Sequence, residues 1–553
     1  MVKHYFELIC EQIRNRWDEK ALTDYVDAPA HATGDEQDYT FGTMAIQVLR
    51  LHKLFEQLGL KAGDKIALAG RNCANWAVAY LAVASYRGVI VSILQDFAPE
   101  DICNLLKHSD SKALFVGPFI WKEMKHMEAL PELEAVISLT NFGVLRMKEQ
   151  TLPMLNIAER RTTAKEDILK HLDALVADLK EHNEDMTLIN YTSGSTGSPK
   201  GVMLPYKAMS NNVAIAHQVL PCKGGQTVVS MLPLAHMYGQ LAEFLYPVSG
   251  GNHVFFLTRT PTPTLLLKAF KAVQPYLIVT VPLVIEKIYR KQIFPILNTK
   301  AMQIGWHTPG LDLILKAVVK KNLKKAFGGN IIYFLCGGAA INPDVEKCLM
   351  DIHFPISVGY GMTECGPLIG GTIPKKFVAR SGGQVVLNMQ AKIDNPNAEG
   401  IGEILVKGDN VMLGYYKNEE ATKAVFTKDG WMRTGDLGYI DKHNFIFLKG
   451  RNKTMMLGPS GQNIYPEEIE DKLNNLDAVV ESVVVERDGK LVALVFPDYD
   501  WKAEDKSMTD IMKENLAELN KRLPSFSQIT NIELMRKEFE KTPKKSIKRF
   551  LYK

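Results

Sequence analysis

The N-terminal part of the chain alternates between helical and strand patterns. Residues 41–60 place apolar side chains at spacings of three and four, which predicts an amphipathic helix. A short apolar run at 64–70 predicts a buried strand, and pairs of helical and apolar segments follow at 76–94 and 98–118. The pattern returns after residue 187. Strands that alternate with helices at this spacing are typical of βαβ units, so we expect layered α/β subdomains with largely parallel sheets.

The pattern changes toward the C-terminus. Short apolar runs separated by Gly and Asp turns predict antiparallel strands, or a small β-barrel-like part, at 402–408, 430–441 and 445–451. After residue 450, a helix with a proline at its start and a hairpin indicate a small α+β unit. We therefore expect an α/β protein with a large N-terminal domain at 1–449 and a small C-terminal domain at 450–553.

The composition narrows the class of protein. The 66 Lys and Arg residues against 62 Asp and Glu residues give a net charge of +4, which argues against chain-wide binding to nucleic acid. Seven cysteines lie scattered without a CxxC pair, so we expect reduced thiols and neither disulfides nor a zinc site. The start of the chain is charged, and the longest apolar run, at 276–285, is about half a membrane span. These features indicate a soluble cytoplasmic protein.

The loop YTSGSTGSPKG at 191–201 is the strongest local signal for chemistry. It follows an apolar run and combines four hydroxyl side chains with two spaced glycines and Lys200. Backbone N–H groups and hydroxyls in such a loop can surround phosphate oxygens. The loop does not have the GxxxxGK[ST] pattern of a Walker loop. By itself it is equally consistent with a flexible linker.

Two further short segments carry suitable polar groups. In GYGMTE, at 359–364, Glu364 could hold Mg²⁺, Thr363 could donate to a phosphate, and Tyr360 offers a flat face to a base. In TGDLGYID, at 434–441, the carboxylate of Asp436 suits a ribose diol. Each segment taken alone is also consistent with an ordinary surface turn.

The order of the motifs resembles one known family. TSGSTGSPKG, CGGAAI, GYGMTE, TGDLGYID and GRNKTMMLGPSGQNIYPEEIE follow one another at wide separations over nearly the whole chain. In this the chain is similar to the adenylate-forming superfamily of acyl-CoA synthetases, luciferases and nonribosomal adenylation domains. The resemblance implies an enzyme that joins a carboxylate to AMP from ATP, releases pyrophosphate and hands the acyl group to a thiol. It also implies that the C-terminal domain is mobile.

The resemblance implies a role for each motif. The mobile phosphate loop would comprise Thr192, Ser193, Gly194, Ser195, Thr196, Gly197 and Lys200. The adenine pocket would comprise Gly338, Ala339, Ala340, Gly361 and Tyr360, with Tyr360 stacked on the base. Thr363 would contact the α-phosphate and Glu364 would hold Mg²⁺, while Asp436 and Arg451 would bind the ribose hydroxyls. Such groups suit the reaction, because attack on the α-phosphorus builds negative charge that donors and a metal stabilise.

Other positions concern the acid, the thiol and the rotation of the domain. The resemblance places the hinge at Lys453 and lines the CoA tunnel with Gly461. His236, in LPLAHMYGQ, resembles the acyl pocket of long-chain fatty acyl-CoA synthetases, although it is also consistent with a core histidine. We therefore expect a fatty acid–CoA ligase for medium or long chains. An aryl acid, or a carrier protein in place of CoA, is the alternative.

The end of the chain departs from the family pattern. The family ends in a segment like TPSGKILR, whose lysine stabilises the adenylation transition state, whereas TPKKSIKR at 542–549 has Ser546 at that position. Loss of such a donor costs about 10²- to 10³-fold in rate. We expect a neighbouring lysine, foremost Lys545, to supply the charge. The alternatives are a solvated basic terminus or a binding protein impaired in adenylation.

Residues 286–325 are strongly basic. They contain nine Lys or Arg residues against Glu286 and Asp312. Within them two stripes at a spacing of four share one helix, an apolar stripe at Leu315, Val319, Leu323 and Phe327 and a basic stripe at Lys316, Lys320 and Lys324. Such a helix can rest on an anionic membrane, or it can be an outer helix packed on the core. The oligomeric state is not readable from the sequence.

Overall fold

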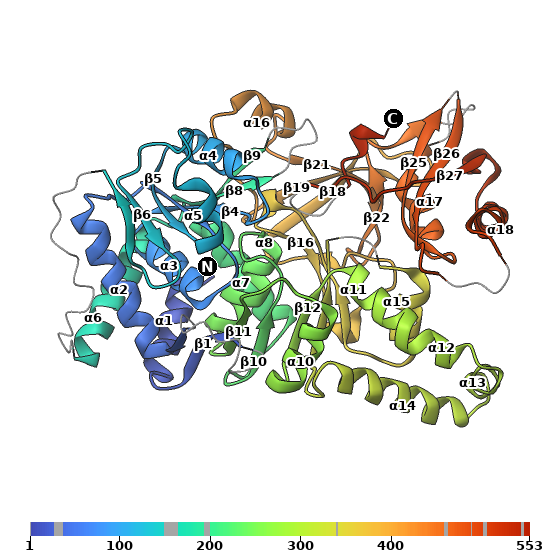
Figure 1. The fold of residues 1–553 in the computed structure, drawn as a ribbon, viewed down its shortest axis with the longest axis horizontal. Helices are drawn as coiled ribbons and strands as arrows, with labels where there is room; N and C mark the ends of the chain where they lie inside the picture. The colour runs from blue at the N-terminus through green and yellow to red at the C-terminus, as the bar shows by residue number, and fades with distance from the viewer. Residues whose placement is uncertain are drawn as a thin grey trace.

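The computed structural model describes residues 2–26, 37–148, 164–192, 199–338, 341–457, 463–487, 489–501, 506–542 and 547–552. It confirms the expected α/β architecture, with a large N-terminal part and a smaller C-terminal part beside it (Figure 1). The helix expected at 41–60, for example, is α2 (Phe41–Gln57), whose Thr40 caps the first turn.

An eight-stranded sheet lies in the N-terminal half. Its central strands are parallel, and antiparallel strands border them at both ends. The order is β20 (Gly414–Tyr415), β9 (Lys200–Pro205), β8 (Met186–Thr192), β4 (Val89–Ile93), β3 (Lys65–Ala69), β5 (Ser111–Val116), β6 (Ala135–Ser138) and β7 (Val144–Met147). Helices of this half are α1 (Tyr5–Asn15), α2, α3 (Ala74–Ser85), α4 (Pro99–His108), α5 (Pro118–Met124), α6 (Lys165–Glu181) and α7 (Tyr206–Val219).

A second sheet of seven strands follows, and all its pairs except β1 with β2 are parallel. The order is β14 (Ile356–Val358), β13 (Tyr333–Cys336), β12 (Leu277–Thr280), β10 (Thr227–Ser230), β11 (His253–Leu257), β1 (Lys20–Tyr25) and β2 (Asp38–Thr40). Its helices include α8 (Met237–Gly239), the π-helix η2 (Gln240–Leu245), α9 (Tyr246–Ser249), α10 (Pro263–Val273), α11 (Pro282–Ile288), α12 (Phe294–Leu297), α13 (Lys300–Trp306), α14 (Leu311–Ala326) and α15 (Pro343–Asp351).

Antiparallel strands follow the second sheet, as the sequence predicts. One sheet contains β15 (Tyr360–Gly361), β16 (Leu368–Gly371) and β17 (Gln384–Val385). The other contains β18 (Met389–Asp394), β19 (Gly402–Gly408), β21 (Met432–Ile440) and β22 (Ile446–Arg451). The short helix α16 (Glu419–Val425) lies between β20 and β21 in the chain.

The C-terminal part has a hydrophobic core of its own, formed within residues 464–552. The expected hairpin is present as β25 (Val479–Arg487) and β26 (Lys490–Pro497), and β27 (Asn531–Leu534) pairs with β26 in parallel. The helices α17 (Pro466–Leu473) and α18 (Met508–Lys521) pack on this sheet, and the two-residue strands β23 (Met456–Leu457) and β24 (Asn463–Ile464) precede them. The boundary between 449 and 450 stays a prediction.

No helix in the part of the chain that the structure describes is both long enough and apolar enough to cross a bilayer. The seven cysteines are free thiols, and five of them are buried.

Candidate active site

The strand pair β8–β9 and the short strand β20 bring two of the motifs together. Tyr415, in β20, pairs with Val202 of β9, and its hydroxyl donates to Oε1 of Glu364 at 2.9 Å. The ammonium of Lys200 lies 4.9 Å from the centre of the same ring. Tyr415 is buried, so one fixed side chain positions both the lysine that ends the phosphate loop and the carboxylate of GYGMTE. The sequence analysis missed Tyr415, because only a strand pairing more than 200 residues apart brings it here.

The segment expected to bind phosphate begins and ends on two paired strands. Thr192 pairs with Lys200 across the antiparallel β8 and β9, and its hydroxyl donates to the Lys200 carbonyl at 3.5 Å. The other expected members of the loop, Ser193, Gly194, Ser195, Thr196 and Gly197, lie outside the described residues. The described strands hold the two ends of the loop next to each other.

A tight turn presents Thr363 and Glu364. Both belong to a 3₁₀ turn at Thr363–Cys365, and Thr363 is buried. Asn212 of α7 anchors this turn, because its side-chain amide donates to the Cys365 carbonyl at 3.1 Å and accepts from the Leu368 N–H at 2.9 Å. Gly361 has no room for a side chain, since a Cβ there would lie 2.1 Å from the Pro367 carbonyl oxygen. Gly361, the second glycine of GYG, is therefore a steric requirement of the turn.

Asp436, the residue expected to bind the ribose, is held by two partners. The hydroxyl of Tyr360 donates to Oδ2 of Asp436 at 2.7 Å, and Nε of Arg451 lies 3.1 Å from Oδ1. The antiparallel pairing of β21 with β22 sets Asp436 directly opposite Arg451. Burial raises the pKa of Asp436, and the positive charge of Arg451 opposes that rise. Tyr360 is buried and holds this carboxylate; its stacking on adenine stays a prediction.

The carboxylate of Glu364 is a suitable ligand for Mg²⁺. This ion prefers oxygen ligands and is often bound by one or two carboxylates together with substrate phosphates. No group of three metal-ligating side chains occurs among the residues that the structure describes. A single carboxylate near Lys200 fits a metal that enters with the nucleotide.

His236 lies in a loop beside the CGG segment at 336–338, which is expected to line the adenine pocket. Its ring nitrogen accepts from the Tyr238 N–H at 3.2 Å, which caps α8. The Tyr238 ring packs against Gly337, where a Cβ would lie 3.1 Å from Cζ. Gly338 follows with φ +86°, while Ala339 and Ala340 lie outside the described residues. The histidine loop and the CGG segment are therefore neighbours.

A buried acid on the π-helix η2 fixes the start of this loop. Glu243 is fully buried and accepts from the Met231 and Leu232 N–H groups at 2.9 Å each, and from the Ser230 hydroxyl at 3.1 Å. Burial raises its pKa well above the ordinary value for Glu. Sequence reasoning gave no signal for Glu243, because a lone Glu in an apolar run is also typical of a helix surface.

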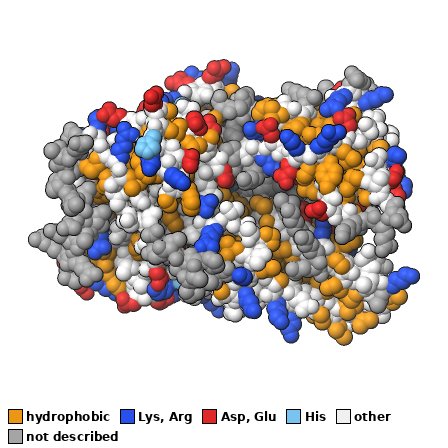
Figure 2. All heavy atoms as spheres, in the orientation of Figure 1, with side chains coloured by type: hydrophobic (Ala, Val, Ile, Leu, Met, Phe, Trp, Pro, Cys, Tyr) orange, Lys and Arg blue, Asp and Glu red, His pale blue; other side chains and the backbone are white. Residues whose placement is uncertain are grey.

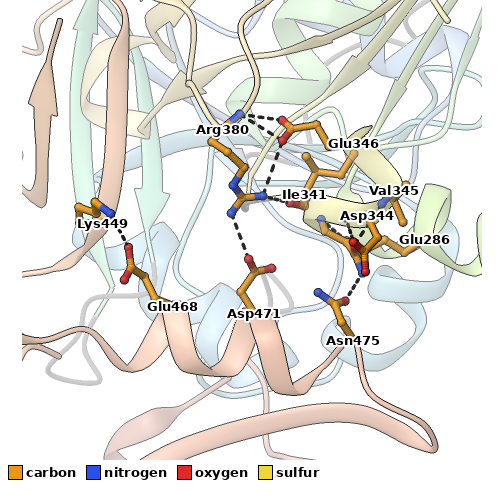
Figure 3. Close-up of polar contacts among 11 residues, drawn as sticks. Glu286, Ile341, Asp344, Val345, Glu346, Arg380, Lys449, Glu468, Asp471 and Asn475 are labelled. Carbon is orange, nitrogen blue, oxygen red and sulfur yellow. Dashed lines mark hydrogen bonds and ion pairs between the residues drawn. The ribbon is translucent and has the colours of Figure 1, made fainter. Parts of the chain in front are cut away.

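The C-terminal part contacts the N-terminal part through α17 (Figure 3). Asp471 accepts from Arg380 at 3.0 Å, and Glu468 accepts from Lys449 at 2.9 Å. The Arg380 N–H also lies 3.1 Å from each oxygen of the buried Glu346 (Figure 3). These charged contacts hold one orientation of the C-terminal part.

Some expected residues of the hinge and tail fall within the described chain and others outside it. Lys453 is exposed between β22 and β23, and its role as a hinge stays a prediction. Gly461, Lys545 and Ser546 lie outside the described residues. Arg549, three positions after Ser546, donates to Oε1 of Glu470 in α17 at 2.8 Å. The described end of the tail is therefore anchored on the C-terminal part.

The positioning role of Tyr415 gives a first prediction. Tyr415→Phe keeps the ring beside Lys200 and removes the hydroxyl that donates to Glu364, so we expect kcat/KM for ATP to fall about tenfold, as for a lost hydrogen bond to a charged group. The matched control is Tyr416→Phe, whose hydroxyl donates to the exposed Asp110 at 2.8 Å. Steady-state kinetics at low Mg²⁺ would measure both. Equal losses in the two variants would contradict the assignment.

Comparison with known proteins shows which family the chain matches and which solved structures share its fold. Residues 14–416 match the family model described as AMP-binding enzyme, and residues 454–552 match the AMP-binding enzyme C-terminal domain. The chain is 27% identical to the long-chain-fatty-acid–CoA ligase ACSBG2 of Gallus gallus, over 80% of this chain and 61% of that protein. For ACSBG2 of Rattus norvegicus the identity is 28%, over 86% and 74%. The o-succinylbenzoate–CoA synthetase MenE of Bacillus subtilis, solved with AMP, shares the fold, with a TM-score of 0.71 and 20% identity over 99% of this chain and 98% of that chain.

Proposed function

Because this chain belongs to the family of AMP-binding enzymes, we propose that it activates a medium- or long-chain fatty acid with ATP and transfers the acyl group to CoA. The family resemblance expected from the motifs is thereby confirmed. One observation supports the adenylation step. Lys200 lies over the ring of Tyr415, and Glu364 accepts a hydrogen bond from the hydroxyl of the same residue. The names of the relatives support a fatty acid as the substrate.

The proposed reaction begins with attack of the fatty acid carboxylate on the α-phosphorus of ATP, and pyrophosphate leaves. Lys200 and Thr363 would donate to the phosphate oxygens, while Asp436 and Arg451 would hold the ribose. Mg²⁺ bound at Glu364 would neutralise part of the phosphate charge. The second half-reaction is attack of the CoA thiolate on the acyl-AMP carbonyl, which releases AMP. No protein nucleophile is needed, so positioning and charge stabilisation supply the catalysis.

Two alternatives concern the acid and the acceptor. MenE shares the fold and is named for an aryl acid, o-succinylbenzoate, which supports an aryl acid as the alternative substrate. A carrier-protein thiol is the alternative acceptor. Ser546 supports a third alternative, a protein that binds the nucleotide but adenylates poorly.

Pyrophosphate release tests the proposal. The full chain is incubated with ATP, Mg²⁺ and acids of about eight to eighteen carbons, beside aryl acids, with and without CoA. We expect turnover with a fatty acid and acyl-CoA as the product. Turnover with aryl acids alone would contradict the assignment of a fatty acid as the substrate. ATP binding without any release of pyrophosphate would contradict the assignment of an adenylating enzyme.

The tail gives a prediction within the same assay. If Lys545 supplies the missing charge, Lys545→Ala should slow pyrophosphate release by about 10²-fold, and Ser546→Lys in that variant should restore it. Acyl-CoA formation from supplied acyl-AMP should change little, because the lysine acts on adenylation. Ser546→Ala is the matched control and should leave both steps unchanged. Full activity of Lys545→Ala would contradict the role of this lysine.

A further inference from the structure

An exposed apolar surface lies at one end of the molecule, where α13 turns into α14 (Figure 1). Ile304 is 71% exposed, Leu313 68% and Ile314 62%. Together with the exposed Ile296, Leu311 and Val318, these side chains form what we call the apolar tip. Figure 2 shows hydrophobic side chains gathered at this lower right end. Large contiguous apolar patches on a soluble surface mark interaction sites.

The apolar tip is not the stripe that the sequence predicted. Val319, Leu323 and Phe327 are buried and pack in the core of the second sheet. That stripe therefore packs inward, as expected for an outer helix on the core. The exposed face of α14 carries different residues, since Leu311, Ile314 and Val318 recur at spacings of three and four on its first half.

Lysines occupy the same exposed face beyond the apolar tip. Lys321 and Lys325 continue the spacing on the second half of α14 and are exposed, with Lys320 and Lys324 half-buried beside them. Between residues 294 and 327 the only acidic residue is Asp312, which forms an ion pair with Lys316 at 3.0 Å. A second copy of this lysine-rich face would be repelled, whereas an anionic surface would be attracted.

We propose that the apolar tip and the lysines of α14 dock this protein on an anionic lipid bilayer. The apolar tip enters the boundary between headgroups and acyl chains, and Lys321 and Lys325 contact the headgroup phosphates. The apolar end matches the acyl-chain region of such a membrane, and the cationic surface beside it matches the anionic headgroup region. This surface lies outside the candidate active site, so the inference does not depend on the proposed function.

Vesicle sedimentation with the full chain tests the proposal. We expect binding to vesicles of phosphatidylcholine with about one third phosphatidylserine, and about tenfold weaker binding to pure phosphatidylcholine or in 0.5 M salt. Leu313→Asp with Ile314→Asp should weaken binding at least tenfold, and so should Lys321→Glu with Lys325→Glu. These side chains are exposed, so the thermal unfolding temperature should not change.

Matched controls lie on α5, elsewhere on the surface. Phe119 is 68% exposed there, and Lys122 and Lys125 are exposed beside it. Phe119→Asp, and Lys122→Glu with Lys125→Glu, should bind vesicles like the unchanged protein. Equal binding to neutral and anionic vesicles, no binding to either, or equal losses in tip and control variants would each overturn the proposal. Binding to acidic proteins without vesicle binding would overturn it in favour of a protein partner.

Discussion

Asp436→Ala is expected to lower kcat/KM for ATP by about 100-fold. The carboxylate is buried, and Tyr360 and Arg451 fix its two oxygens at 2.7 and 3.1 Å. Its loss would remove the proposed hydrogen bonds between a charged group and the ribose, and it leaves the buried Tyr360 hydroxyl without this partner. Steady-state kinetics of pyrophosphate release with varied ATP would measure the loss.

The same variant tests which part of the nucleotide Asp436 binds. In the unchanged protein, 2′-deoxy- and 3′-deoxy-ATP should be poorer substrates than ATP, because a site built to bond a hydroxyl rejects an analogue without it. Asp436→Ala should lose most of that preference. Asp429→Ala is the matched control, since Asp429 lies in an exposed turn just before the same strand and should leave kinetics unchanged. A preference for the ribose hydroxyls that survives in Asp436→Ala would refute this role.

Arg549→Ala is expected to lower the free energy of unfolding of the C-terminal part by about 3–5 kcal/mol, the typical cost of leaving a buried charge unpaired. Glu470 is buried in α17 and is held by both terminal nitrogens of Arg549 and by the Val484 N–H at 2.6 Å. Among the described residues that bond to the Glu470 carboxylate, Arg549 is the one cation, so its removal leaves the carboxylate without a positive partner. Urea unfolding monitored by circular dichroism would measure the loss.

The pH dependence of that loss has a definite sign. Burial raises the pKa of Glu470 to about 7, although Arg549 opposes the rise. A Glu whose pKa is higher in the folded than in the unfolded state destabilises the fold when it is ionised. The free energy of unfolding therefore falls as pH rises above the pKa of the unfolded state. The deficit of Arg549→Ala should therefore be larger at pH 8 than at pH 6.

Two controls separate the ion pair from general effects. Arg536→Ala removes an exposed arginine of the same part and should change stability by less than about 0.5 kcal/mol. Glu470→Leu combined with Arg549→Leu replaces both charges by apolar groups and should recover much of the stability. A deficit of the single variant no larger than that of Arg536→Ala would contradict the assignment.

The sequence predicts the elements better than their long-range contacts. The helix at Phe41–Gln57 and the hairpin β25–β26 follow from local periodicity and turn residues, so they were predictable. GYGMTE ends in the tight turn at Thr363–Cys365, which restricts residue type, whereas TGDLGYID lies in strand β21. Tyr415 and Asn212 were not predictable, since only strand pairing and helix packing bring them to Glu364 and Cys365.

The orientation of α14 shows a different limit. Its sequence places apolar residues on more than one face, so periodicity alone does not say which face meets the core. In the structure Val319 and Leu323 pack in the core of the second sheet, whereas Leu313 and Ile314 are exposed. Lys316, Lys320 and Lys324 lie along one border of the buried stripe, and Lys321 and Lys325 lie on the exposed face.

The pairing of β1 with β11 constrains the order of events during synthesis. Leu22 pairs with Val254, so β1 has no parallel partner until more than 200 further residues have left the ribosome. At about 5–20 residues per second, this delay lasts on the order of ten seconds or more. A strand whose edge stays unpaired this long is exposed to mispairing with other chains. The N-terminal segment is therefore where nascent chains of this protein should most need a chaperone.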